Sequence, residues 1–353
     1  MQVVRLPIYV PVIPNGRGRL LHHASFAARA QTVMLAEAKR RRPDVVIGIA
    51  PSLISTLAAR TTARIFGARL WLHIQDFEVE AAFATGLLSD KGLVARAALG
   101  LETMSLKADR ISTISPEMCA KLLERGIPPE KIVEFRNWAS IDRVVPLDGP
   151  SRFRAEWGID RPHVALYSGN IANKQGIEII VEAARLLARR RDLVFAICGE
   201  GPNRERLVAA ARGCDNIRFF DLQPVERLSG SLGLASVHLL PQIAGAADLV
   251  LPSKLTNMLA SGRPVVAIAP EGSGLAHEVD GVGLVTEPEN APAFAAAIAT
   301  LLDDEALSEE LGRAARKRAE ERWSKTRILG KFEHELRACV GRAPIAAAVP
   351  ASR

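Results

Sequence analysis

The feature that most constrains the fold is an alternation, repeated along the chain, between short apolar runs rich in β-branched residues and longer stretches with helical periodicity. The segments 44–49 and 69–74 have the length and composition of buried strands. Strands that alternate with helices form βαβ units, in which successive strands lie parallel in one sheet. The alternation therefore predicts an α/β fold built on parallel sheets.

The chain of 353 residues is long enough for two such domains, each with its own core. Proline and glycine concentrate in residues 144–151, which predicts a linker. We expect an N-terminal Rossmann-like domain over 1–145 and a second over 151–322. A helical segment, 323–340, is expected to pack back on the first domain. The Ala- and Pro-rich end, 341–353, has too little apolar bulk to order itself and is expected to be disordered.

The same pattern predicts individual elements. In the first half we expect strands at 3–10, 44–49, 69–74 and 108–114, with a helix at 20–42 that ends in a basic cluster before Pro43. In the second half the expected strands are 163–168, 193–198, 216–219, 236–240, 264–269 and 283–286. The expected helices are 176–190, 202–211, 254–261, 291–302, 306–321 and a last one that ends near Cys339.

Positive charge is concentrated in the first half. Residues 1–150 carry 20 Lys and Arg against 14 Asp and Glu, whereas residues 151–353 carry 26 against 25. A basic first domain suits an anionic membrane surface, a phosphate-bearing acceptor or nucleic acid. Zinc-finger spacing, an aromatic RNA-binding motif and a basic zipper are absent from the sequence, so a nucleic-acid partner is not expected.

The sequence predicts a cytoplasmic protein without disulfides. It contains neither an uncharged apolar run of roughly 18 residues nor a signal peptide. Its four cysteines show no paired spacing, which is typical of reduced thiols rather than of a disulfide frame or a zinc site.

Three corners between strand and helix in the second half have the composition of a phosphate site. In residues 167–176 a strand ends at Gly169-Asn170, where the backbone can approach a ligand, and Lys174 adds a positive charge. An ordinary turn with a solvated lysine explains this loop equally well. The second corner, Gly199-Glu200-Gly201, again places glycines after a strand, although such turns are common.

The third corner, residues 244–266, is the most specific signal in the chain. A loop of small residues leads to a helix that opens at Pro252 and Ser253, where free amides can meet a diphosphate and Lys254 can neutralise it. Asn257 lies one turn later on the same helical face. In an open α/β fold, loops that converge at the carboxyl edge of the sheet are the expected place for a ligand.

These motifs together resemble the retaining GT-B glycosyltransferases of family 4, most closely the branch of colanic-acid and exopolysaccharide biosynthesis. The resemblance rests on residues 252–267, 167–170 and 199–202, and it extends to 71–78, 114–118 and 137–138. It implies two Rossmann-like domains that face a central cleft. It also implies transfer of a sugar from a UDP- or GDP-sugar to a lipid-linked glycan at the inner membrane face.

The family's donor-binding residues carry over only in part. Its paired glutamates correspond to Asn257 and to Leu249 or its neighbour, with Asp248 the only carboxylate nearby. The arginine that grips the diphosphate in the family corresponds to Asn170, and Lys174 lies near the position of the family's lysine. We therefore expect Lys254 to be the principal cation, with Gly199 and Glu200 beside it.

In the first domain, His73 and Asp76 follow one strand and are the catalytic candidates, either for contacts to the transferring sugar or for taking the acceptor's proton. A lone histidine at a strand end is otherwise a structural residue. The resemblance also implies that a strand, a glycine-rich loop and a long helix should precede the strand at 3–10, so that the chain begins at about the third element of the family's first domain.

Neither a metal nor another cofactor is expected, since the sequence has no Asp-x-Asp motif. Two other interpretations remain open. One is a degenerate nucleotide-sugar-binding protein without activity, which the altered glutamates favour. The other is an NAD-dependent oxidoreductase, disfavoured because no Gly-x-Gly-x-x-Gly opens a helix with an acidic residue about twenty positions later.

Overall fold

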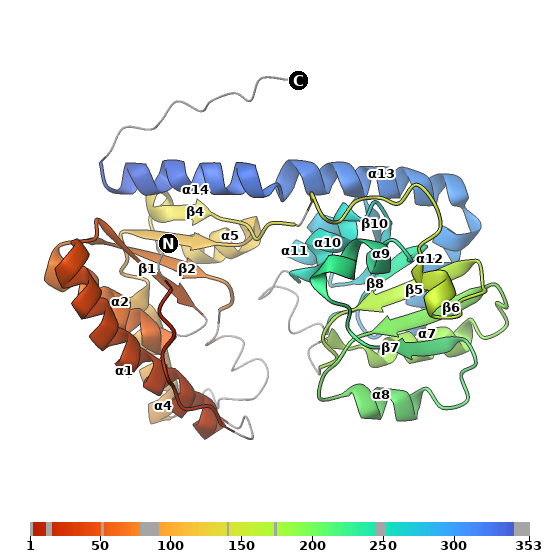
Figure 1. Ribbon diagram of the computed structural model, residues 1–353, viewed down its shortest axis with the longest axis horizontal. Coiled ribbons are helices and arrows are strands. Elements are labelled where there is room, and N and C mark those ends of the chain that lie inside the picture. The colour runs from red at the N-terminus through yellow and green to blue at the C-terminus, as the bar shows by residue number, and fades with distance from the viewer. Residues whose placement is uncertain are drawn as a thin grey trace. The chain divides into compact units, whose positions relative to one another are not determined.

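A computed structural model describes residues 3–11, 16–50, 53–77, 79, 92–139, 141–172, 175–243 and 252–341. The chain divides into two compact units (Figure 1). The first comprises residues 1–136 together with 329–353, and the second comprises residues 137–328.

The first unit is built on a parallel sheet. Its strands lie in the order β1-β2-β3-β4, with bounds Val45–Ala50, Arg69–Ile74, Arg110–Thr113 and Ile132–Glu134. Its helices are α1 (Gly16–Arg41), α2 (Leu53–Phe66), α4 (Leu93–Ser105), α5 (Pro116–Glu124), the 3-10 turn η1 (Pro129–Lys131) and the last helix, α14 (Lys325–Cys339). The predicted alternation of strands and helices, with the strands parallel in one sheet, is confirmed here.

Two helices cover opposite faces of this sheet. Gly48 of β1 faces Thr56 and Ala59 of α2 closely enough that an added β-carbon would lie 3.4 Å from the Ala59 β-carbon. On the other face Phe332 of α14 meets the ring of Trp71 edge-on at 5.1 Å. The C-terminal helix thus completes the core of the first unit.

The prediction of a strand at 3–10 is wrong. Residues 3–11 have no regular secondary structure, and Pro7 and Pro11 cannot donate to a strand ladder. Tyr9 instead bonds to α1: its amide donates to Ser25 Oγ at 3.1 Å, and its carbonyl lies 2.7 Å from His22 Nδ1. Side chains of a helix therefore satisfy the backbone groups that a neighbouring strand would otherwise satisfy.

The second unit contains a larger parallel sheet in the order β10-β9-β8-β5-β6-β7. Its strands are, in chain order from β5 to β10, His163–Ser168, Leu193–Cys198, Ile217–Phe220, Val237–Leu240, Val265–Ile268 and Gly283–Thr286. Its helices are, in chain order, α6 (Phe153–Glu156), α7 (Glu178–Leu186), α8 (Arg204–Ala210), η3 (Val225–Arg227), α9 (Leu228–Leu232), α10 (Lys254–Ala260), α11 (Gly274–Val279), α12 (Ala291–Asp303) and α13 (Glu305–Arg322).

Helices cover both faces of the second sheet, which explains why its strands are apolar throughout (Figure 1). One core lies between the sheet and helices α7, α8 and α12. The other lies between the sheet and helices α9, α10 and α13. Strands buried on both faces hold their carboxyl ends, and the loops that follow them, in fixed positions.

Candidate functional site

The strand order of the second sheet reverses between β5 and β8. From β5 the chain proceeds outward to β6 and β7, and it then returns to the other side of β5 to form β8 and proceed to β9 and β10. Connections that leave in opposite directions open a crevice at the carboxyl ends of these two strands. The loop after β5 and the helix α10, which follows β8, border this point.

The first two predicted corners interlock through backbone hydrogen bonds. The amide of Gly169 donates to the Cys198 carbonyl at 3.0 Å, and the amide of Ile171 donates to the Glu200 carbonyl at 2.8 Å. The amide of Asn203 then donates back to the Ile171 carbonyl at 3.1 Å. The loops after β5 and β6 are therefore one rigid structure.

Glycine is required where these loops cross. A β-carbon on Gly199 would lie 2.0 Å from the Gly169 carbonyl oxygen, and one on Gly201 would lie 2.3 Å from the Ile171 carbonyl oxygen. Gly169 and Gly201 also have φ angles of 147° and 150°, which side chains rarely permit. The glycines predicted as ligand-facing thus have a packing role as well.

Lys254, the first residue of α10, reaches across to this structure. Its ammonium lies 4.1 Å from the centre of the Tyr167 ring. A β-carbon on Gly169 would lie 3.3 Å from Lys254 Cδ and 3.6 Å from Nζ, so the glycine leaves room for the lysine. The structure therefore brings together the first and third predicted corners.

The ammonium of Lys254 is buried, and no residue that the structure describes gives it a polar partner. Within the described part of the chain, its Nζ is inaccessible to solvent and makes no hydrogen bond. Burial lowers the pKa of Lys254 to about 7. A buried cation–π contact contributes about 2 kcal/mol. That contribution offsets only part of the cost of removing a charged ammonium from water. A buried cation in need of an anion is the strongest chemical signal of this site.

Tyr167 is the residue that links the two sides of the site. Its ring is fully buried beneath Lys254, and its hydroxyl donates to the Asn170 carbonyl at 2.6 Å. Burial raises the pKa of the phenol, which stays neutral. Tyr167 was not among the predicted site residues, although the sequence shows an aromatic side chain directly before Ser168-Gly169 at the strand end.

The other predicted donor residues differ in position. Asn170 and Glu200 are exposed on the interlocked loops, and Glu200 lies 3.7 Å from Arg204. Ser253 is exposed and its hydroxyl does not cap α10, while Asn257 is half-buried on that helix. Lys174, Asp248 and Leu249 lie outside the described residues.

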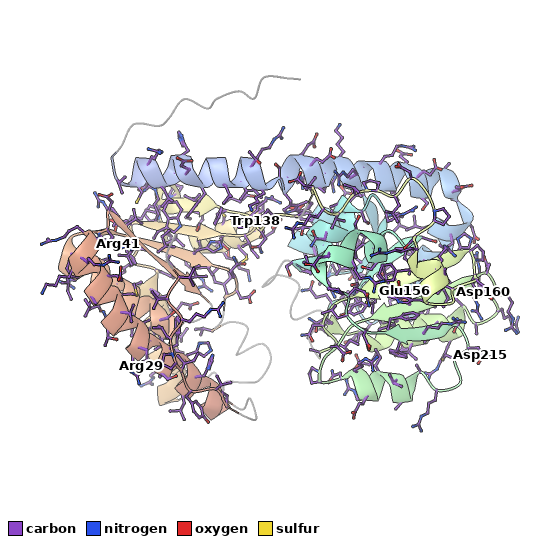
Figure 2. All side chains as sticks on the ribbon, in the orientation of Figure 1. Arg29, Arg41, Trp138, Glu156, Asp160 and Asp215 are labelled. Atoms are coloured by element: carbon purple, nitrogen blue, oxygen red, sulfur yellow. The ribbon has the colours of Figure 1, made fainter. Side chains whose placement is uncertain are left out.

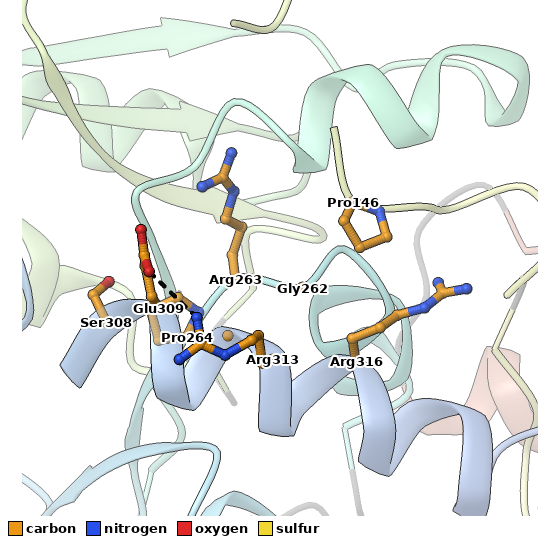
Figure 3. Close-up of a pocket in the computed structure, with 9 residues that line it drawn as sticks. Pro146, Gly262, Arg263, Pro264, Ser308, Glu309, Arg313 and Arg316 are labelled. Atoms are coloured by element: carbon orange, nitrogen blue, oxygen red, sulfur yellow. Dashed lines mark hydrogen bonds and ion pairs between the residues drawn. The ribbon is translucent and has the colours of Figure 1, made fainter. Parts of the chain in front are cut away.

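A cavity of about 330 Å³ in the second unit is separate from this site (Figure 3). It lies between α13 and the segment Gly262–Pro264, which precedes β9, and is therefore at the amino edge of the sheet. Arg316 beside it donates to the carbonyls of Val144 and Ala260 at 2.8 and 2.9 Å. This arginine ties the predicted linker to α10 and α13.

In the first unit, His73 is enclosed by its own sheet. Only 5% of the residue is exposed, and burial lowers the pKa of its imidazole to about 4. Its Nδ1 lies 2.9 Å from Ser112 Oγ, and its Nε2 lies 2.6 Å from the Gln75 amide nitrogen. Asp76 and Gln75 follow β2 and are half-buried.

Comparison with known proteins identifies the family. Residues 1–138 match the model of a glycosyl transferase 4-like domain, and residues 151–318 match that of glycosyl transferases group 1. The chain is 38% identical over 346 residues to a protein whose name assigns it to colanic acid biosynthesis, the glycosyl transferase WcaI of Escherichia coli (strain K12). That alignment covers 95% of this chain and 84% of the relative. The chain belongs to the GT-B glycosyltransferases of the colanic-acid type.

Solved structures agree with this fold. Anabaena HepE in complex with UDP matches with a TM-score of 0.72 at 15% identity, over 92% of this chain and 84% of HepE. Sucrose-phosphate synthase from Thermosynechococcus elongatus matches with a TM-score of 0.70 at 20% identity, over 89% of this chain and 78% of the synthase. The predicted GT-B class, with a Rossmann-like sheet in each unit, is thereby confirmed.

Proposed function

We propose that this glycosyltransferase transfers a sugar from a UDP- or GDP-sugar to a lipid-linked oligosaccharide in exopolysaccharide biosynthesis, with retention of the anomeric configuration. The family supports the glycosyl transfer. The colanic-acid assignment of the relative and the UDP bound to HepE support the pathway class and the donor class.

The observation that carries this proposal is the buried ammonium of Lys254 at the strand-order reversal of the second sheet. A diphosphate supplies the negative charge that no described residue gives to this cation, and a protein interior strengthens that attraction relative to water. As the bond to the sugar breaks, charge builds on the leaving diphosphate. Lys254 is proposed to stabilise that charge, with Lys174 adding a second cation and without a metal ion, because the amides of Gly169 and Ile171 already bond to the loop after β6.

The remaining donor contacts are proposed on the same edge. Asn170, Gly199 and Glu200 border the β5 and β6 loops, and Ser253 and Asn257 lie on or beside α10. Asp248 and Leu249 precede α10 in sequence and are proposed to face the sugar. In the first unit, the segment at the end of β2 is proposed to meet the transferring sugar and the acceptor, with Asp76 in contact and the enclosed His73 behind it.

The basic first unit is proposed to rest on an anionic membrane, where a lipid-linked acceptor would be found. Helix α1 ends in Lys39, Arg40 and Arg41, and Figure 2 shows Arg29 and Arg41 on this helix. On α2, Arg60 and Arg64 line a cavity of about 340 Å³ together with the exposed side chains of Leu57 and Ile65. None of the described helices has the length and apolarity to cross a bilayer.

The membrane part is tested by cosedimentation with vesicles of phosphatidylglycerol or of phosphatidylcholine. We expect binding to the anionic vesicles alone, weakening from 50 to 300 mM salt because surface attraction is screened. Equal binding to both lipids, or none to either, would remove this part of the proposal.

The transfer is tested by incubating the protein with a lipid extract that contains polyprenyl-linked oligosaccharides and, in turn, labelled UDP-glucose, UDP-galactose, GDP-mannose and GDP-fucose. We expect label to enter the lipid fraction from one donor, and replacing Lys254 by Met to reduce the rate at least 100-fold. Lys325→Met is the matched control, since Lys325 also begins a helix and lies 5.9 Å over an aromatic ring, that of Trp138, but is exposed. Full activity of Lys254→Met would contradict the placement of the diphosphate.

A non-catalytic nucleotide-sugar-binding protein is the second candidate, because Asn257, and Leu249 or its neighbour, are the positions that correspond by resemblance to the family's paired glutamates. Binding of a nucleotide sugar without any transfer or hydrolysis would favour it.

A further inference from the structure

A chain of side-chain hydrogen bonds runs along one face of the first unit's sheet and reaches Gln75, just after β2. The indole nitrogen of Trp71 donates to Ser112 Oγ at 2.8 Å, and Nδ1 of His73 lies 2.9 Å from the same oxygen. The Gln75 amide nitrogen lies 2.6 Å from the other ring nitrogen of His73. Residues on two neighbouring strands therefore connect a buried tryptophan to a half-buried glutamine.

The sheet register explains why these groups meet. His73 and Ser112 are directly paired between β2 and β3, so their side chains lie on the same face. Phe135, which follows β4, closes over the imidazole edge-on at 5.1 Å and is itself stacked on Phe332 of α14 at 4.2 Å. Four segments thus fix the position of the imidazole ring.

This enclosure leaves His73 no free nitrogen. Whichever way the Gln75 amide is turned, each ring nitrogen has a protein partner and the neutral ring satisfies both bonds. A second proton would place a charge on a ring that is 5% exposed, which burial disfavours. His73 is therefore poorly suited to accept a proton from an acceptor hydroxyl.

Gln75 lies one residue beyond the end of the same strand. Its backbone amide donates to the Ala50 carbonyl at 3.3 Å, which anchors it beside the end of β1, while its side chain is half-buried at the carboxyl edge of the sheet. That edge is where open α/β folds present groups to ligands. An amide has both a donor and an acceptor, as recognition of sugar hydroxyls requires.

We propose that His73 is a positioning residue, and that it holds Gln75 in the orientation in which the Gln75 amide hydrogen-bonds a hydroxyl of the donor sugar or of the acceptor glycan. The proposal rests on the proposed function for the identity of the hydroxyl. It assigns no proton transfer to His73. Trp71 and Ser112 act only by fixing the ring.

The first test needs no substrate. Long-range proton–nitrogen NMR of the imidazoles of the full chain, with His73 assigned from a His73→Asn variant, should show one neutral ring that does not titrate between pH 5 and 8. Gln75→Ala should shift its Nε2 resonance and leave the remaining six histidines unchanged. A His73 midpoint near 6.5, or a resonance indifferent to Gln75→Ala, would overturn the positioning role whether or not the protein is an enzyme.

The second test is a double-mutant cycle on the rate of transfer or hydrolysis of the labelled donor. His73→Asn and Gln75→Ala should each lower kcat/KM roughly fivefold to tenfold, the effect of one neutral hydrogen bond, and the double variant should be no worse than Gln75→Ala alone. Gln75→Asn, which keeps the amide but shortens the side chain by one methylene group, should not restore the kcat/KM of the unaltered protein.

A rise in the donor KM in these variants would identify the donor sugar as the partner of Gln75, and a rise in the acceptor KM would identify the glycan. Multiplicative losses in the double variant would show that His73 acts independently of Gln75 and would refute the proposal. Absence of any turnover by the unaltered chain would refute the proposed function instead, while the NMR measurement would still decide the role of His73.

Discussion

Binding of a nucleotide sugar should be accompanied by uptake of a proton at Lys254. Burial holds the pKa of this lysine at about 7 in the free protein. A bound diphosphate favours the charged form and should return the pKa toward the ordinary value of about 10.4. At pH 8 the free lysine is about 90% neutral, so about 0.9 proton should be taken up, against about 0.5 at pH 7 and about 0.1 at pH 6.

The same linkage fixes the pH dependence of affinity. The charged form binds, and its population in the free protein falls as pH rises through 7. The donor should therefore bind about fivefold more weakly at pH 8 than at pH 7, and about tenfold more weakly again at pH 9.

Isothermal titration calorimetry measures the uptake directly. At pH 8, titrations with UDP-glucose and GDP-mannose in buffers of different ionisation enthalpy, such as HEPES and Tris, give the number of protons from the slope. Nucleotide sugars are suitable because their phosphates do not titrate near neutral pH. Lys254→Arg keeps its charge and should bind without uptake, whereas Lys325→Met should retain about 0.9 proton. Tight binding by the unaltered protein without uptake, or uptake that persists in Lys254→Met, would refute the reasoning.

Three further perturbations test the surrounding structure. Tyr167→Phe keeps the ring under Lys254 but loses the bond to Asn170, and should lower the free energy of unfolding by about 1 kcal/mol in a denaturant titration while donor binding persists. Tyr167→Leu should weaken donor binding as well. Equal donor binding by both variants would argue against a role for the ring. Gly199→Ala should abolish donor binding because its β-carbon would lie 2.0 Å from the Gly169 carbonyl, whereas Gly100→Ala in α4, with nothing within 4 Å, should melt at or above the unaltered temperature; donor binding by Gly199→Ala would show that the loops can separate. Arg316→Met should cost about 2 kcal/mol of stability by leaving the Val144 and Ala260 carbonyls without their donor. Arg313→Met, which loses an exposed pair with Glu309, should change stability by less than about 0.5 kcal/mol. Equal losses of stability in the two variants would contradict the stabilising role of the Arg316 hydrogen bonds.

The sequence predicted the second sheet closely because its strands are apolar runs buried on both faces. The predicted strands 163–168, 193–198 and 283–286 have the observed bounds, and helix α10 begins at Lys254 as expected. Helix α7 (Glu178–Leu186) is shorter than the predicted 176–190, because the backbone after Leu186 continues in turns, as in the bond from the Arg190 amide to the Leu187 carbonyl. Periodicity finds elements well, but local turns decide where they end.

The error at 3–10 has a similar cause. Val3, Val4, Tyr9 and Val10 give the segment the composition of a strand, but all four are exposed, and the backbone of Tyr9 bonds to α1 instead. Strand propensity reflects how well side chains pack on a pleated sheet, and a segment forms a strand only if another strand is there to pair with it.

The candidate site was predictable as a set of loops and not as a set of contacts. Glycine corners and the Pro252-Ser253-Lys254 helix start are visible in the chain, and parallel topology implies that they converge. That Lys254 would be buried over Tyr167 depends on two residues far apart in sequence, which no local pattern joins. Likewise His73 stood out by residue type, whereas its partners come from later in the chain, Ser112 from β3 and Phe135 from the segment after β4.

The central claim is that the second unit holds a nucleoside diphosphate through Lys254, and a thermal-shift panel with UDP, GDP and NAD tests it most directly. Ligand at 100 times its dissociation constant adds about 2.7 kcal/mol of stability. We predict a shift with UDP or GDP, lost in Lys254→Met, kept in Lys325→Met and absent with NAD. A shift with NAD alone, or an undiminished nucleoside-diphosphate shift in Lys254→Met, would contradict the account.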